Sequence, residues 1–91
     1  MATELRDVMR GLLRQASVAG DSSATLAGGL VVRVSRSGRG YRITAERVKV
    51  QPAEHELHTL EVALAELGWR VHQRGNEEAG LLQRKWFEVG D

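Results

Sequence analysis

The chain has 91 residues, of which 42% are hydrophobic and 27% charged, with a formal net charge of +1 and no cysteine. This composition excludes wholesale disorder, disulfides, thiolate nucleophiles and cysteine-ligated zinc. The length predicts a single domain over residues 1–91 whose modest core leaves no room for a deep substrate cavity. No stretch is apolar enough to cross a bilayer and the first residues do not form a secretory signal, so we expect a cytoplasmic protein without membrane contact.

Opposite charges are concentrated in neighbouring segments. Residues 30–50 carry six basic residues and one acidic residue, whereas residues 51–68 carry four glutamates and no Lys or Arg. We therefore expect a dipolar molecule, with a basic hairpin beside an acidic helix. Either the two segments neutralise each other within the fold, or the basic side chains project into solvent, where they can contact phosphates or an acidic protein.

A first helix is predicted between Thr3, a suitable N-cap, and Gly20, a suitable C-terminal stop. Residues 19–29, which are rich in Gly, Ser and Ala, are predicted to form a mobile loop. The arginines of the helix form one stripe that we expect to be solvated, namely Arg6, Arg10 and Arg14. The apolar positions recur with helical period and should face the core: Leu5, Val8, Met9, Leu12 and Ala16.

A basic β-hairpin is predicted over residues 30–50. Apolar and polar side chains alternate on both sides of residues 37–40, a segment with turn-forming composition. Val48 and Val50 are out of phase with the earlier apolar positions of the second strand, which predicts a β-bulge near residues 46–47.

A second helix is predicted to begin at residues 51–52 and to end at Gly68. Two strands are predicted after it, at residues 69–74 and 81–89, joined by a polar loop over residues 75–80. The helix has the clearest periodic seam of the chain: Ala53, Leu57, Leu60, Leu64 and Leu67.

The element order α-β-β-α-β-β indicates an α+β fold. We expect a two-layer sandwich in which two helices cover one face of a four-stranded antiparallel sheet. Moving the last strand to the front would give the βαββαβ order, so the arrangement resembles a permuted ferredoxin-like domain. Such folds host many functions, and the architecture alone implies none of them.

The second helix carries the residues that come closest to a metal site. Glu54, His58 and Glu61 share one helical face beside His55, and imidazole with carboxylate suits Zn²⁺. The spacing differs from that of metalloproteases, and this face points away from the apolar seam. We interpret it as a solvated polar face and assign no metal and no cofactor. The chain also has no Gly-x-Ser-x-Gly turn and no phosphate loop, so no catalytic residue is assigned.

The last strand places two aromatic residues side by side. Trp86 and Phe87 must point to opposite faces of the sheet, one toward the core and one outward. An outward aromatic among basic residues is typical of a base-stacking platform, and equally of a protein contact. The residues predicted to bind nucleic acid or a partner are Arg33, Arg36, Arg39, Arg42, Arg70, Arg84 and Trp86.

Three functions are compatible with these patterns. The first is a small non-catalytic module that binds nucleic acid through the basic hairpin and an exposed aromatic. The second is a protein–protein interaction or homodimeric assembly module that uses the open sheet face or an edge strand. The third is a small toxin-like ribonuclease, since Leu67-Gly68-Trp69 before two strands resembles such toxins. Asn76 follows Gly75 where the toxins carry the catalytic histidine, and His72 is the nearest substitute.

Overall fold

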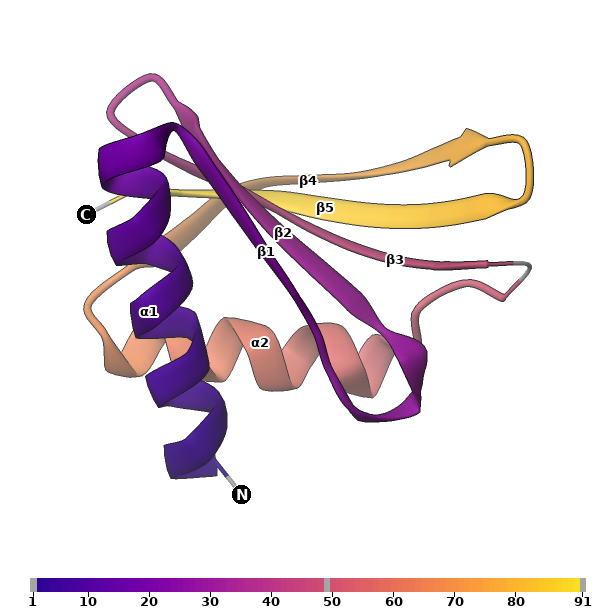
Figure 1. Cartoon of the computed structure of the whole chain (residues 1–91), viewed down its shortest axis with the longest axis horizontal. Coiled ribbons are helices and arrows are strands. Elements are labelled where there is room, and N and C mark those ends of the chain that lie inside the picture. Colours follow the sequence, from indigo (N-terminus) through magenta and orange to yellow (C-terminus); the bar gives the residue numbers. More distant parts are fainter. Residues whose placement is uncertain (1, 49, 91) are drawn as a thin grey trace.

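The computed structural model describes residues 2–48 and 50–90 as two helices on one five-stranded antiparallel sheet (Figure 1). The α+β class is confirmed, whereas the predicted strand count of four is wrong. Neighbouring strands lie in the order β1-β2-β3-β5-β4. No helix among the described residues is long and apolar enough to cross a bilayer. In chain order the elements are α1 (Ala2–Ala19), β1 (Asp21–Thr25), the 3-10 turn η1 (Ala27–Gly29), β2 (Val31–Ser37), β3 (Gly40–Val48), α2 (Glu54–Glu66), β4 (Arg70–Ala79) and β5 (Leu82–Gly90).

The additional strand, β1, lies in the segment that we predicted to be a loop. Its sequence, Asp-Ser-Ser-Ala-Thr, has low strand propensity, which is why alternation of apolar residues does not reveal it. It pairs along its whole length with β2. The Ser22 hydroxyl also donates a hydrogen bond of 2.7 Å to the Leu12 carbonyl of α1. Pairing and helix contact therefore outweigh local propensity at this edge.

Both helices cover the same face of the sheet, and the core lies between the two layers (Figure 1). Phe87 is 2% exposed in this core, which makes Trp86 the aromatic on the opposite, open face. Among the described residues, no helix covers that open face. The buried apolar side chains are Met9, Leu12, Leu13 and Ala16 of α1, Leu60, Ala63 and Leu64 of α2, and Leu30, Val32, Val34, Ile43, Ala45, Phe87 and Val89 in and beside the sheet.

The predicted β-bulge near residues 46–47 is wrong. Strand β3 pairs with β5 without interruption as far as Val48. Glu46 therefore lies on the open face, Arg47 on the helix face, and Val48 is left 57% exposed instead of returning to the core. The irregularity in this sheet is a register shift in β4, between Val71 and Gln73.

The loop predicted over residues 75–80 is also wrong, because β4 continues to Ala79 and only a tight turn separates it from β5. Gly75 lies opposite Trp86 in this longer hairpin. A Cβ atom at position 75 would overlap the indole ring of Trp86. The glycine therefore serves the packing of a neighbouring side chain and does not mark a loop.

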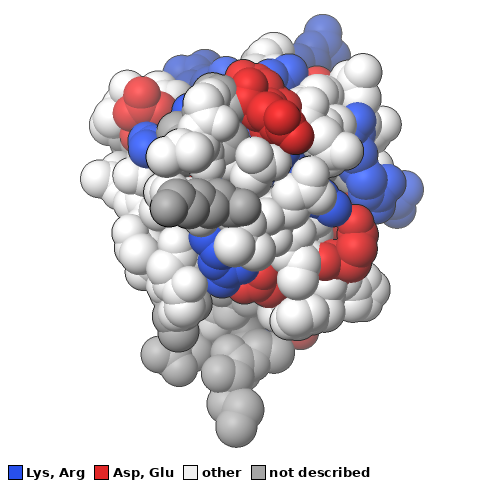
Figure 2. Space-filling model, turned by 90° about the vertical axis from the view of Figure 1, so that its right-hand side faces the viewer, with Lys and Arg blue, Asp and Glu red and all other residues white. Residues whose placement is uncertain are grey.

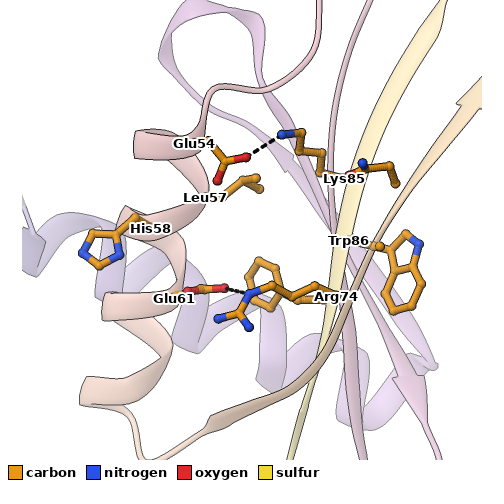
Figure 3. Close-up of a pocket in the computed structure, with 10 residues that line it drawn as sticks. Glu54, Leu57, His58, Glu61, Arg74, Lys85 and Trp86 are labelled. Carbon is orange, nitrogen blue, oxygen red and sulfur yellow. Dashed lines mark hydrogen bonds and ion pairs between the residues drawn. The ribbon is translucent and has the colours of Figure 1, made fainter.

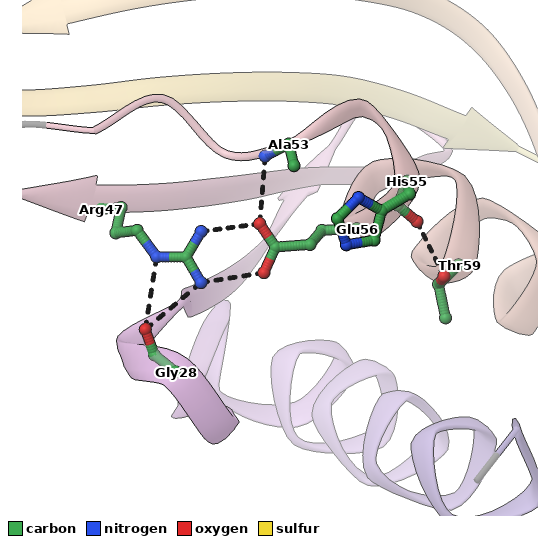
Figure 4. A network of polar contacts seen from close by, with 6 residues as sticks. All are labelled: Gly28, Arg47, Ala53, His55, Glu56 and Thr59. Atoms are coloured by element: carbon green, nitrogen blue, oxygen red, sulfur yellow. Dashed lines mark hydrogen bonds and ion pairs between the residues drawn. The ribbon is translucent and has the colours of Figure 1, made fainter.

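Helix α2 begins at Glu54, later than predicted, and its start is held by an ion pair to the hairpin (Figure 4). The Arg47 guanidinium donates to both oxygens of Glu56, at 2.6 and 2.8 Å. Arg47 also donates to the Gly28 carbonyl, and Glu56 accepts the backbone N–H of Ala53 at 3.0 Å. This cluster joins η1, β3 and the first turn of α2.

Candidate functional site

The open face of the sheet carries three of the predicted binding arginines, and each is paired with a carboxylate of the protein. Arg33 and Arg84 both donate to Glu46 at 2.7 Å. Arg42 donates to Glu88 at 3.2 Å, and the Ser37 hydroxyl joins the same carboxylate at 2.9 Å. An anionic ligand on this face would have to displace these internal partners.

Glu46 is the centre of this network and is only 3% exposed. Burial by itself would raise the pKa of Glu46, but hydrogen bonds from Arg33 and Arg84 outweigh it, and the net shift is downward. The carboxylate is therefore ionised between two guanidinium groups. It was not among the predicted site residues, although its position as the lone acid in a basic hairpin was a signal of internal pairing.

Trp86, the predicted stacking residue, is partly covered by its own neighbours. The Arg42 guanidinium lies 4.1 Å from the centre of its ring, a cation–π contact. The ring also lies against Gly75 of β4. Stacking of a base on Trp86 stays a prediction, and it requires Arg42 to move or to stack together with the base.

The other three predicted arginines, Arg36, Arg39 and Arg70, lie exposed at one end of the sheet. None of them forms an ion pair with any residue that the structure describes. Arg36 lies opposite Tyr41 at the end of β2, and Arg39 is in the β2–β3 turn. Figure 1 shows this turn next to the C-terminal end of α1, at the upper left.

Two arginines of α1 that are not among the predicted binding residues extend this region. Arg10 and Arg14 are exposed, and Arg10 has only a loose 3.4 Å pair with Asp7. Their spacing of four residues was visible in the sequence, but only the fold brings them beside the hairpin. We call the set Arg10, Arg14, Arg36, Arg39 and Arg70 the basic end.

A groove opens between the α1 arginines and the α2–β4 connection. Its volume is about 380 Å³. Tyr41 and Trp69 meet there edge to face, with ring centres 5.2 Å apart and planes at 82°. The residues that line the groove are Arg10, Leu13, Arg14, Ser17, Tyr41, Leu67 and Trp69.

The acidic face of α2 turns toward the C-terminal hairpin, where it forms a second hollow of about 490 Å³ (Figure 3). Lys85 donates to Glu54 at 2.7 Å and Arg74 donates to Glu61 at 2.8 Å, so the hollow is bridged by two ion pairs. The hydrogen bond from Lys85 lowers the pKa of Glu54. Among the described residues, no group of three His, Asp or Glu side chains is arranged to hold a metal ion.

The carboxylates of α2 therefore neutralise the C-terminal hairpin more than the basic one. Of the arginines in residues 30–50, only Arg47 pairs with this helix, through Glu56. The end of the molecule that lies on the right in Figure 1 faces the viewer in Figure 2, and basic and acidic groups are interspersed there. The arginines that have no ion-pair partner among the described residues, Arg14, Arg36, Arg39 and Arg70, lie toward the opposite end.

Comparison with known proteins adds no relative: no family model, no curated protein and no solved structure matches this chain.

Proposed function

We propose that this protein is a small non-catalytic module that binds an anionic polymer, most simply nucleic acid, through its basic end. The observation that carries the proposal is the gathering of exposed guanidinium groups at one end of the molecule. Arg14, Arg36, Arg39 and Arg70 have no carboxylate partner among the described residues, and Arg10 has only the exposed 3.4 Å pair with Asp7. On the open face, in contrast, Arg33, Arg42 and Arg84 each pair with a carboxylate of the protein. Unpaired guanidinium groups at one end supply the phosphate contacts that dominate nucleic-acid affinity.

The proposed contact surface is the basic end and not the open face of the sheet. On that face Arg33, Arg42 and Arg84 face Glu46, Glu77 and Glu88, so its charges compensate each other. A ligand on it would gain phosphate contacts only by breaking pairs already made. At the basic end, Arg36 and Arg39 form no ion pair with any described residue, so a phosphate there displaces none of those carboxylates.

Salt dependence tests the proposal. We assume that each of four arginines contacts one phosphate, namely Arg14, Arg36, Arg39 and Arg70. The logarithm of the association constant for a single strand should then fall with the logarithm of the salt concentration, with a slope of about −3. Binding is measured by fluorescence anisotropy of a labelled oligonucleotide of about 12 nucleotides, within the site size of small single-strand-binding domains. Affinity that does not change with salt would contradict the proposal.

A matched pair of variants separates the basic end from net charge. The double variant Arg36→Gln, Arg39→Gln should weaken binding and flatten the salt slope by about 1.4. The control Arg74→Gln, Lys85→Gln removes the same charge from the hollow beside α2, where both cations pair with glutamates. Equal losses in the two variants would mean that only net charge matters and that the basic end is not the site.

Homodimeric assembly is the second candidate, and strand β4 favours it. This strand of ten residues is an edge of the sheet. Its first half carries Arg70, His72 and Arg74, and its second half carries Glu77 and Glu78. An antiparallel second copy would set the basic half of one strand against the acidic half of the other. Sedimentation tests it: a dimer that Glu78→Lys dissociates supports edge pairing, and a monomer at the highest soluble concentration removes it.

The proposal also includes a cytoplasmic location, which suits a cysteine-free chain. For the fold, we propose a permuted ferredoxin-like sheet formed by β2 to β5, with β1 added at the edge. The strand order β2-β3-β5-β4 supports this assignment.

A further inference from the structure

The groove at the basic end differs in chemistry from the hollow beside α2. Its floor is apolar and aromatic, with Leu13, Tyr41 and Trp69, and its rim carries Arg10 and Arg14. No Asp or Glu is among the described residues that line it. The hollow beside α2, in contrast, has Glu54 and Glu61 in its wall, each already paired with a cation.

A planar ring linked to a negatively charged phosphate is the ligand that such a groove fits. Aromatic side chains stack on flat π systems, and guanidinium groups bind phosphate in a fixed fork geometry. The volume of about 380 Å³ is within the range of about 300–1,000 Å³ typical of small-ligand sites. Ser17 at the rim adds a hydroxyl that can donate or accept a hydrogen bond.

We propose that the groove takes an unstacked base of a single-stranded nucleic acid, while neighbouring phosphates contact Arg10, Arg14 and Arg36. The inference rests on the proposed function and adds strand selectivity to it. Bases within a duplex are stacked on both faces, so they cannot reach Trp69 unless the duplex opens. The protein should therefore prefer single strands to duplexes of the same sequence at the same salt concentration.

Tryptophan fluorescence reports directly on the groove, because the chain contains two tryptophans. In the variant Trp86→Phe, Trp69 is the sole tryptophan, and we expect a single-stranded oligonucleotide to quench its emission. In the variant Trp69→Phe, the emission of Trp86 on the open face should change little. The reverse pattern would place the base on the open sheet face and would overturn the inference.

Affinity measurements use two substitutions of the groove. Trp69→Leu should weaken single-strand binding about 5- to 150-fold, the range for losing one stacked base. Because Trp69 also packs against the core, Ser17→Glu is the second test, since it places a carboxylate at an exposed position of the groove rim. Its matched control is Val18→Glu, which adds the same charge one residue later at a side chain that is 86% exposed and does not line the groove.

The outcomes separate the two proposals. Stronger loss in Ser17→Glu than in Val18→Glu, together with preference for single strands, supports the groove. Equal binding of single strands and duplexes, with Ser17→Glu equal to Val18→Glu, overturns the groove. The basic end still stands in that case if Arg36→Gln, Arg39→Gln weakens binding more than the control Arg74→Gln, Lys85→Gln does. If no oligonucleotide binds at low salt, both proposals fall.

Discussion

Arg47 of β3 and Glu56 of α2 form a bidentate ion pair, with N–O distances of 2.6 and 2.8 Å (Figure 4). Both side chains are about four-fifths buried, at 21% and 20% exposure. Arg47 also reaches the Gly28 carbonyl, so one guanidinium ties the η1 turn, the hairpin and the helix start together. Among the residues that the structure describes, this contact is the one ion pair between the basic hairpin and the acidic helix, whose mutual neutralisation was one of the two alternatives that their sequences left open.

Removing the carboxylate from this contact should destabilise the fold. In Glu56→Gln, Arg47 loses a charged acceptor and the Ala53 N–H loses its carboxylate partner. We expect a loss of about 1–2 kcal/mol in the free energy of unfolding, measured by urea denaturation. The control is Glu61→Gln, whose partner Arg74 is 66% exposed, and its loss should be within about 0.5 kcal/mol. Equal losses of unfolding free energy in the two variants would mean that burial does not strengthen the ion pair between Arg47 and Glu56.

Acid should weaken the protein through the same carboxylate. The hydrogen bonds from Arg47 and from the Ala53 N–H lower the pKa of Glu56 from 4.5 to about 2. The unfolded chain therefore binds a proton at higher pH than the folded chain does. The stabilisation by Glu56 is complete above about pH 4.5 and is lost as the pH falls toward about 2.

The urea midpoint measured across this range checks the expectation. Wild-type stability should fall steadily below pH 4.5, and the decline in Glu56→Gln should be shallower because one titrating group is gone. The lowered pKa of Glu46 acts in the same direction, so some decline should persist in the variant. Parallel curves for the two proteins would show that Glu56 is not responsible.

Breaking the Glu46 pairs should have opposite effects on stability and on anion binding. Glu46→Gln leaves Arg33 and Arg84 facing each other across a neutral side chain that is nearly inaccessible to solvent. We expect a loss of about 1–3 kcal/mol in the free energy of unfolding. At the same time, Arg33 is released and Arg84 keeps only its 3.4 Å pair with Glu77, so the affinity for oligonucleotides should rise. The matched control is Glu77→Gln, which removes the same charge from an exposed partner of Arg84; equal gains in affinity would contradict the explanation.

Alternation and helical period in the sequence predicted most of the architecture, because those signals come from residues that face the core. Val32, Val34 and Ile43 alternate and are buried, and Leu60 and Leu64 follow the seam of the second helix. Strand β1 carries no such signal, since its stability comes from its neighbours. The bulge predicted from Val48 failed because a terminal valine can be left in solvent at little cost.

The candidate site was less predictable because it is assembled from distant segments. The hairpin arginines were visible, but their partners Glu88 and Glu46 are set by strand register. The groove brings together Arg14, Tyr41 and Trp69, which are separated by more than twenty residues in each step. Charge counts along the chain cannot tell a paired guanidinium from a free one.

Gly75 and Trp86 provide a final test of the described register. A Cβ atom at position 75 would overlap the indole ring, so Gly75→Ala should cost about 1–3 kcal/mol in the free energy of unfolding. The overlap is relieved when the side chain at position 86 is smaller. The double variant Gly75→Ala, Trp86→Leu should therefore lose less unfolding free energy than the sum of the two single variants, with a coupling of at least about 0.5 kcal/mol.

Gly11→Ala is the control, because nothing lies within 4 Å of that position. Since Gly11 is in the middle of α1, its replacement should instead stabilise the protein by about 0.5–1 kcal/mol. Additive losses in the double variant would mean that β4 and β5 are paired in another register.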